Sequence, residues 1–128
     1  MIDLADPSAE VLQFLADRHL ATLTTMRRNG SPHVAPVGFS YTAHDRVARV
    51  ITFPASVKAR NAALGGRAAL CQIDGGRWLT LEGTVRLVTD PSGVAAAVEG
   101  YAARYRQPGE RADRVALEIV VDRILGRA

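Results

Sequence analysis

Apolar and polar residues alternate along most of this chain, and this period of two residues predicts a mainly β protein. We expect six strands, over residues 20–27, 33–41, 46–53, 67–73, 77–88 and 114–125. Short turns such as Asn29-Gly30 separate most neighbouring strands and favour antiparallel hairpins.

Three other segments carry apolar residues at helical spacing and interrupt the strands. We expect helices over residues 7–18, 57–64 and 91–105, which gives the order αβββαββαβ. Asp6 and Asp90 each stand directly before a proline, so we expect both to be N-cap residues.

Hairpin-linked strands with only short helices between them do not form a doubly wound parallel sheet. We therefore expect the six strands to close into a small antiparallel barrel, because closure removes unpaired sheet edges. The 128 residues contain no repeat, linker or low-complexity segment, so we expect a single domain over residues 1–128. This length is short for an enzyme that encloses a ligand alone, and a site shared between two copies fits it.

Charge and cysteine content narrow the choice of partners. The formal net charge is +3, and the arginines are scattered, with Arg27 and Arg28 as the only adjacent pair. Such scatter favours an anionic small molecule over nucleic acid. The single Cys71 cannot form an internal disulfide, which fits a reducing cytoplasm. No apolar run approaches the roughly 18 residues of a membrane span, so we expect no membrane contact.

Several kinds of catalytic motif are missing from the sequence. The three histidines fall in different predicted elements, so we expect no metal site. The chain lacks a Gly-x-Ser-x-Gly elbow, a phosphate loop and a paired set of acidic residues. We therefore expect no catalytic side chain, and the reactive atom of an enzymatic reaction would belong to a bound cofactor.

Lys58 is the only lysine in the chain, and it stands at the start of the second predicted helix. The first amides of a helix and the compact charge of an ammonium group both favour phosphate binding. A solvated surface lysine is the alternative interpretation.

Three runs of sequence carry a resemblance to a known family. They are SPHVAPVGF at residues 31–39, ARVITFPASVKARN at 48–61 and DGGRWLTLEG at 74–83. Together they resemble the split β-barrel family of pyridoxamine-phosphate-oxidase-like proteins, which implies a Greek-key barrel that binds a flavin-like cofactor as a homodimer. More narrowly they are similar to the actinobacterial branch that uses the deazaflavin coenzyme F420, including its biliverdin reductases.

The resemblance also implies which residues hold the cofactor. A first group lies along the ring of the cofactor, and it comprises His33, Val34, Ala35, Pro36 and Val37. A second group holds the phosphate, and it comprises Thr52, Ser56, Val57 and Lys58, with Asn61 in support. Trp78 of the second subunit covers the cofactor, so the sites lie at the subunit interface. The alternatives are a solvated or hydrogen-bonded strand histidine for His33 and a packed core residue for Trp78.

The implied reaction is hydride transfer from C5 of reduced F420 to an unsaturated anionic acceptor, with biliverdin reduced to bilirubin as the best candidate. Relatives that use flavin mononucleotide (FMN) usually carry arginine where this chain has Val57. A phosphodiester therefore fits better than the terminal phosphate of FMN, and surface arginines such as Arg60 would meet the polyglutamate tail of F420. Two alternatives stay open: an FMN-dependent oxidase, and a carrier that binds F420 or haem without turnover.

Overall fold

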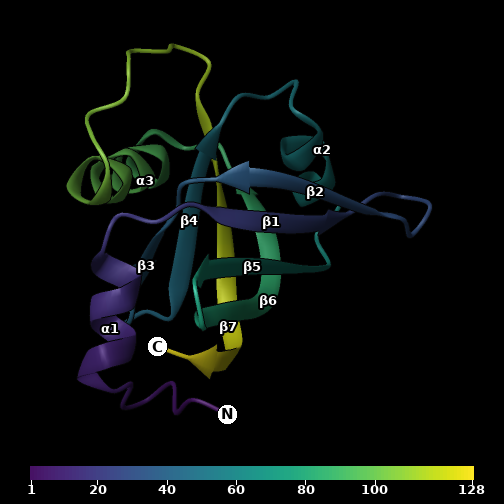
Figure 1. Cartoon of the computed structure of the whole chain (residues 1–128). Helices are drawn as coiled ribbons and strands as arrows, with labels where there is room; N and C mark the ends of the chain where they lie inside the picture. Colours follow the sequence, from purple (N-terminus) through teal and green to yellow (C-terminus); the bar gives the residue numbers. More distant parts are fainter.

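The computed structural model describes residues 1–128 and contains three helices and seven strands (Figure 1). The helices are α1 (Ala9–Ala16), α2 (Val57–Ala63) and α3 (Pro91–Arg104). The strands are β1 (Ala21–Met26), β2 (Pro32–Val37), β3 (Ser40–Thr42), β4 (Val47–Thr52), β5 (Arg67–Asp74), β6 (Arg77–Val88) and β7 (Val115–Arg127). All seven form one antiparallel sheet in the order β2-β1-β5-β6-β7-β4-β3.

The expected strand over residues 33–41 is two strands, so the prediction of six strands was wrong. Its first part, β2, pairs with β1, and its second part, β3, pairs with β4 at the far edge of the sheet. The change of partner takes place at Gly38 and Phe39. A Cβ atom at Gly38 would lie 2.9 Å from the rings of both Tyr101 and Tyr105, so only glycine fits against α3 here.

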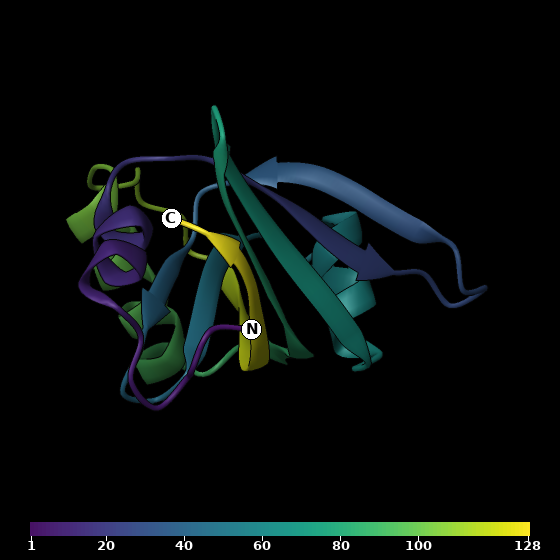
Figure 2. The ribbon, with the colours of Figure 1, turned by 60° about the horizontal axis from the view of Figure 1, so that its bottom comes forward.

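The expected closure of the barrel was also wrong, because no hydrogen bonds join β2 to β3 and both remain edge strands. Figure 2 shows β3 and β4 on one side of β6 and β7, with β1 and β2 on the other. The two edges nevertheless meet at one corner, since only Gly38 and Phe39 separate the end of β2 from the start of β3. The sheet is thus a split barrel held together by this short link.

The core fills the concave side of the sheet. Nineteen buried apolar residues form one cluster, which includes the fully buried Phe14, Phe39, Leu70 and Ile119. Burial of each such side chain stabilises the fold by about 1.5–3 kcal/mol. The N-cap of α1 is Ser8, not Asp6 as expected, because the Ser8 hydroxyl accepts a hydrogen bond of 3.2 Å from the Val11 amide.

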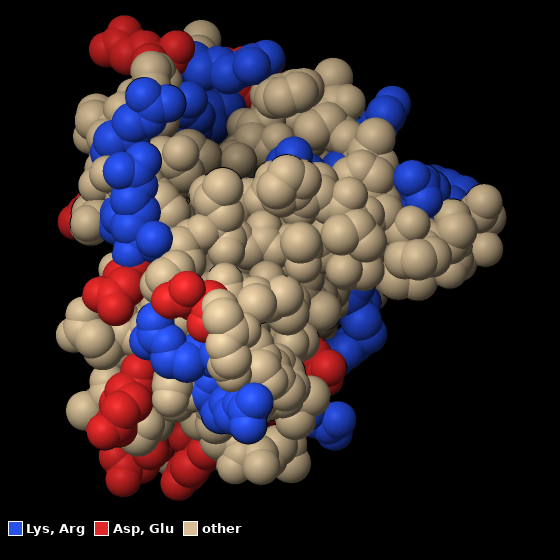
Figure 3. All heavy atoms as spheres, in the orientation of Figure 1, with Lys and Arg blue, Asp and Glu red and all other residues tan.

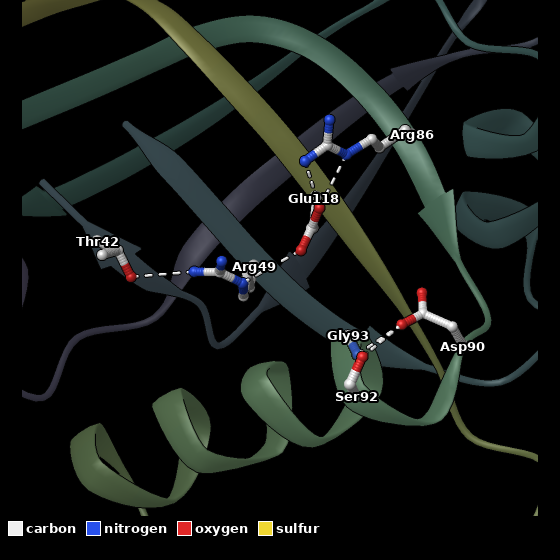
Figure 4. Close-up of polar contacts among 7 residues, drawn as sticks. All are labelled: Thr42, Arg49, Arg86, Asp90, Ser92, Gly93 and Glu118. Carbon is white, nitrogen blue, oxygen red and sulfur yellow. Dashed lines mark hydrogen bonds and ion pairs between the residues drawn. The ribbon is translucent and has the colours of Figure 1, made fainter. Parts of the chain in front are cut away.

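Helix α3 packs on the outer side of β4 and β7, where Ala97 meets Val88 and Ala116. Asp90 is its N-cap, as expected, and accepts a 2.9 Å hydrogen bond from the Gly93 amide (Figure 4). None of the three helices has both the length and the apolar composition of a membrane-spanning helix.

A buried carboxylate joins three strands next to α3. Glu118 on β7 accepts hydrogen bonds of 2.8 Å from Arg86 on β6 and 3.3 Å from Arg49 on β4 (Figure 4). Arg49 also donates to the Thr42 hydroxyl at 3.0 Å. Each formal charge therefore has a partner, as a buried carboxylate requires.

Candidate functional site: a basic cavity at the corner of the sheet

A cavity of about 390 Å³ lies where the ends of β2 and β4 meet the start of α2 and the loop after α3. Its lining includes four basic residues and no acidic one: Lys58, Arg106, Arg111 and Arg114. Val37, Val50 and Ile51 supply an apolar wall beside them. This combination suits an organic anion, with the cations on its phosphate or carboxylate groups and the apolar wall against its body.

Lys58 points into this cavity from the first turn of α2. It is half-buried and makes no side-chain hydrogen bond or ion pair. The turn that presents it is held by the Ser56 hydroxyl, which accepts hydrogen bonds from the Ala59 amide at 3.2 Å and from the Thr52 hydroxyl at 3.0 Å. The Ser56 hydroxyl thus pairs with one of the amides at the start of this seven-residue helix, which is then not available to a ligand. The charge of Lys58, rather than the helix end, therefore provides the attraction for an anion.

The loop of residues 105–114 supplies the other cations. The Arg111 guanidinium lies 4.4 Å from the centre of the Phe53 ring and donates to the Asp113 carboxylate at 2.6 Å. That hydrogen bond raises the pKa of Arg111 and lowers the pKa of Asp113, so both stay charged at neutral pH. Arg114 donates to the Gly109 carbonyl at 2.8 Å and helps to hold the loop in place.

The structure brings together only part of the expected ring-binding strand. Pro36 and Val37 line the cavity, whereas His33, Val34 and Ala35 do not. The side chain of Val34 points outward and is 58% exposed. His33 is half-buried, and its Nδ1 atom is buried without a hydrogen-bond partner.

Of the expected phosphate group, Thr52 and Lys58 line the cavity, and Ser56 and Val57 stand next to Lys58 without lining it. Asn61 points into the protein instead. It is buried, and its Nδ2 atom donates to the Thr25 hydroxyl at 3.0 Å, which ties α2 to β1.

Trp78 lies on a different part of the chain's surface. It stands at the start of β6, opposite Ile73 and Arg127, and it lines none of the larger cavities. The structure therefore does not bring Trp78 and Lys58 together within one chain.

The end of α3 holds the corner of the sheet that carries Val37. The Tyr105 hydroxyl accepts from the Phe39 amide at 3.1 Å and donates to the His19 carbonyl at 2.6 Å. Arg104 donates to the Phe39 carbonyl at 2.8 Å, and burial lowers the pKa of its guanidinium. Both residues therefore fix the link between β2 and β3.

Sequence reasoning assigned no role to the three cavity arginines, Arg106, Arg111 and Arg114. The sequence does place these three arginines within nine residues after a predicted helix, and this grouping could have indicated a basic loop. No group of three or more His, Cys, Asp or Glu residues is placed to hold a metal ion.

Comparison with known proteins gives a family and several relatives. The family model described as pyridoxamine 5'-phosphate oxidase matches residues 7–128. An F420H2-dependent biliverdin reductase of Mycobacterium tuberculosis is 47% identical over 121 residues, which are 94% of this chain and 88% of that protein.

Two solved structures share the fold. A conserved hypothetical protein of M. tuberculosis superposes with a TM-score of 0.79 at 23% identity, covering 95% of this chain and 84% of that one. A structure described as an F420 reductase superposes with a TM-score of 0.71 at 25% identity, covering 88% of this chain and 94% of that one.

Proposed function

Because the chain belongs to the pyridoxamine 5'-phosphate oxidase family, we propose that it is a reductase that uses reduced coenzyme F420 to reduce biliverdin to bilirubin. The 47% identity to an F420H2-dependent biliverdin reductase supports both the cofactor and the acceptor. The free thiol of Cys71 agrees with an enzyme of the reducing cytoplasm.

The basic cavity is the observation that carries this proposal. The phosphodiester and the carboxylates of F420 are anions, and Lys58 faces the cavity together with three arginines and without an acidic residue. The neighbouring side chain Val57 adds no second charge, which agrees with a singly charged phosphodiester rather than the terminal phosphate of FMN.

Each part of the cavity has a task in this reaction. Bound there, reduced F420 would supply a hydride to an unsaturated acceptor, and a proton from solvent would complete the reduction. Lys58, presented by the turn at Ser56, would hold the phosphate, and Pro36 and Val37 would lie against the ring. Val50 and Ile51 keep one wall of the cavity apolar and exclude water from it.

We further propose that the protein is a homodimer with its cofactor sites at the subunit interface. Met26, Val34, Ile73 and Trp78 are exposed on the same outward face of β2, β1, β5 and β6, and the exposed fractions of Ile73 and Trp78 are 64% and 38%. Exposed apolar side chains grouped on one face are typical of an interface. Pairing of this face would let Trp78 of one subunit reach the cavity of the other.

The decisive experiment is a titration of the purified protein with F420 and, separately, with FMN, followed by addition of biliverdin to the complex with reduced F420. We expect tight F420 binding, weak FMN binding, and formation of bilirubin with oxidation of F420. Lys58→Ala is the variant of the cavity, and Arg28→Ala, which removes an exposed arginine of the β1–β2 turn outside the cavity, is its control.

The outcomes separate the possible functions. Tight FMN binding without F420 binding would contradict the proposal and favour an oxidase. F420 binding without reduction of biliverdin would contradict the acceptor and leave a carrier or a reductase of another compound.

A further inference from the structure

A second cleft adjoins the basic cavity. It has a volume of about 370 Å³ and is lined by Arg18, Leu20, Tyr101, Tyr105 and Arg106. Tyr101 and Arg106 line both spaces, so the second cleft continues the first around the end of α3. Figure 3 shows Lys and Arg atoms gathered along this side of the molecule, where α3 and the following loop lie.

The two arginines of the second cleft are free to bind a ligand. Neither Arg18 nor Arg106 makes a side-chain hydrogen bond or an ion pair, and both are exposed. By contrast, their neighbour Arg104 is committed, because it donates to the carbonyls of Asp17 and Phe39 and to Gln72. No acidic residue lines the cleft, so nothing in it competes with an anionic ligand.

The space between the two arginines is suited to a flat, unsaturated body. The rings of Tyr101 and Tyr105 lie 4.9 Å apart between centroids, with 37° between their planes. Leu20 lines the same cleft and is 64% exposed. Aromatic faces and an open leucine favour a conjugated ligand, and flanking guanidinium groups favour its carboxylates.

We propose that this second cleft binds the acceptor through its carboxylate groups, with Arg18 and Arg106 as the binding residues. The inference rests on the proposed function, which supplies an unsaturated acceptor with two carboxylates. The phosphate end of the cofactor then lies by Lys58 in the first cavity, and the acceptor carboxylates lie beyond Arg106 in the second. Arg106 then lies between the two ligands, and its positive charge favours an acceptor with carboxylates over an uncharged analogue.

The test compares biliverdin with its dimethyl ester, which has the same conjugated body but no free carboxylate. Dissociation constants are measured by visible absorbance on the protein saturated with oxidised F420, so the readout does not depend on turnover. The variants are Arg18→Gln and Arg106→Gln, and the control is Arg28→Gln, which removes an exposed arginine that also lacks a partner, in the β1–β2 turn.

We expect Arg18→Gln and Arg106→Gln each to weaken binding of the diacid by about three- to tenfold, the range for a charge-assisted contact near solvent. Binding of the ester should be unchanged in both variants, and Arg28→Gln should behave as the wild type does. Thermal melting checks that each variant folds, and Arg18→Gln should leave the dissociation constant of F420 unchanged.

An equal loss for acid and ester, or no loss for either, would overturn the inference, as would a wild-type protein that binds neither compound. Turnover with reduced F420 is scored separately. Reduction of biliverdin at an unchanged KM in Arg18→Gln and Arg106→Gln contradicts this site and leaves the proposed function standing. Arginine-dependent binding of the diacid without any reduction supports this site and contradicts the proposed function.

Discussion

The hydroxyl of Tyr105 accepts a 3.1 Å hydrogen bond from the backbone amide of Phe39, although 66 residues separate the two in sequence. This bond ties the end of α3 to the link between β2 and β3. Since Val37, directly before that link, lines the basic cavity, the position of α3 sets the shape of the cavity wall.

Removal of the Tyr105 hydroxyl should lower the stability of the fold, and the size of this loss should depend on pH. Burial raises the pKa of Tyr105 above its ordinary value of 10.0, so the neutral phenol stabilises the fold below pH 10, and this contribution disappears as the pH rises through the raised value. We expect Tyr105→Phe to lower the free energy of unfolding by about 1–2 kcal/mol at pH 8. In denaturant titrations from pH 8 to 11, the difference from wild type should shrink, and a constant difference would contradict this role.

A methyl group at Gly38 should have a larger effect than one at an open glycine. The added Cβ of Gly38→Ala would lie 2.9 Å from the rings of Tyr101 and Tyr105, whereas one at Gly76 has no neighbour within 4 Å. We expect Gly38→Ala to lower the free energy of unfolding by about 1–3 kcal/mol and to weaken F420 binding. Gly76→Ala serves as the control, and equal stability of the two variants would contradict the close packing at this corner.

The charge of Lys58 should account for a large part of the cofactor affinity. Lys58→Ala is expected to weaken F420 binding by about 1.5–3 kcal/mol, the size of a charge-assisted hydrogen bond. Fluorescence titration measures the dissociation constant, and added salt should reduce the difference between variant and wild type. An affinity equal to that of the control variant Arg28→Ala would contradict a role of Lys58 in cofactor binding.

Asn61 should matter for stability more than for binding, although the family resemblance implies a supporting cofactor contact. Its loss leaves the buried Thr25 hydroxyl without its 3.0 Å partner. We expect Asn61→Ala to lower the free energy of unfolding by about 1–3 kcal/mol, with less than about a twofold change in F420 affinity for the folded protein. A large loss of affinity with unchanged stability would instead support the direct contact.

A charge on the outward face of β5 should separate the proposed dimer. We expect Ile73→Lys to give a monomer by light scattering and to weaken F420 binding, because Trp78 of the second subunit would no longer reach the cavity. Leu12→Lys changes an exposed leucine on α1 and is the control. A wild-type protein that is monomeric at all concentrations would contradict the interface.

The local pattern of apolar and polar residues predicted most of the secondary structure, but it did not predict that the strand breaks in two at Gly38. Val37 and Phe39 are both buried, and the residues between and beside them keep a strand-like alternation, so the period gives no sign that the chain changes its partner there. The break depends on Tyr101 and Tyr105, which are more than sixty residues away. A single sequence read by local period does not contain that contact.

The candidate site, like the secondary structure, was predicted only in part. The family resemblance named Lys58, Thr52, Pro36 and Val37, which the structure brings to one cavity. No role was assigned to the arginines of residues 106–114, because a loop has no period and its side chains are placed by tertiary contacts, such as that of Arg111 with Phe53. The expected positions of Trp78 and of the second subunit stay predictions.

The place of β7 in the sheet has a consequence for how the protein folds during synthesis. This strand lies between β6 and β4, and it alone joins the β3–β4 pair to the rest of the sheet by hydrogen bonds. The earlier strands can form their hairpins as they leave the ribosome, but the two parts of the sheet cannot join before Val115–Arg127 has emerged. The nascent chain therefore keeps one edge of β4 and one edge of β6 unpaired until Val115–Arg127 has emerged, and unpaired edges of this kind favour aggregation.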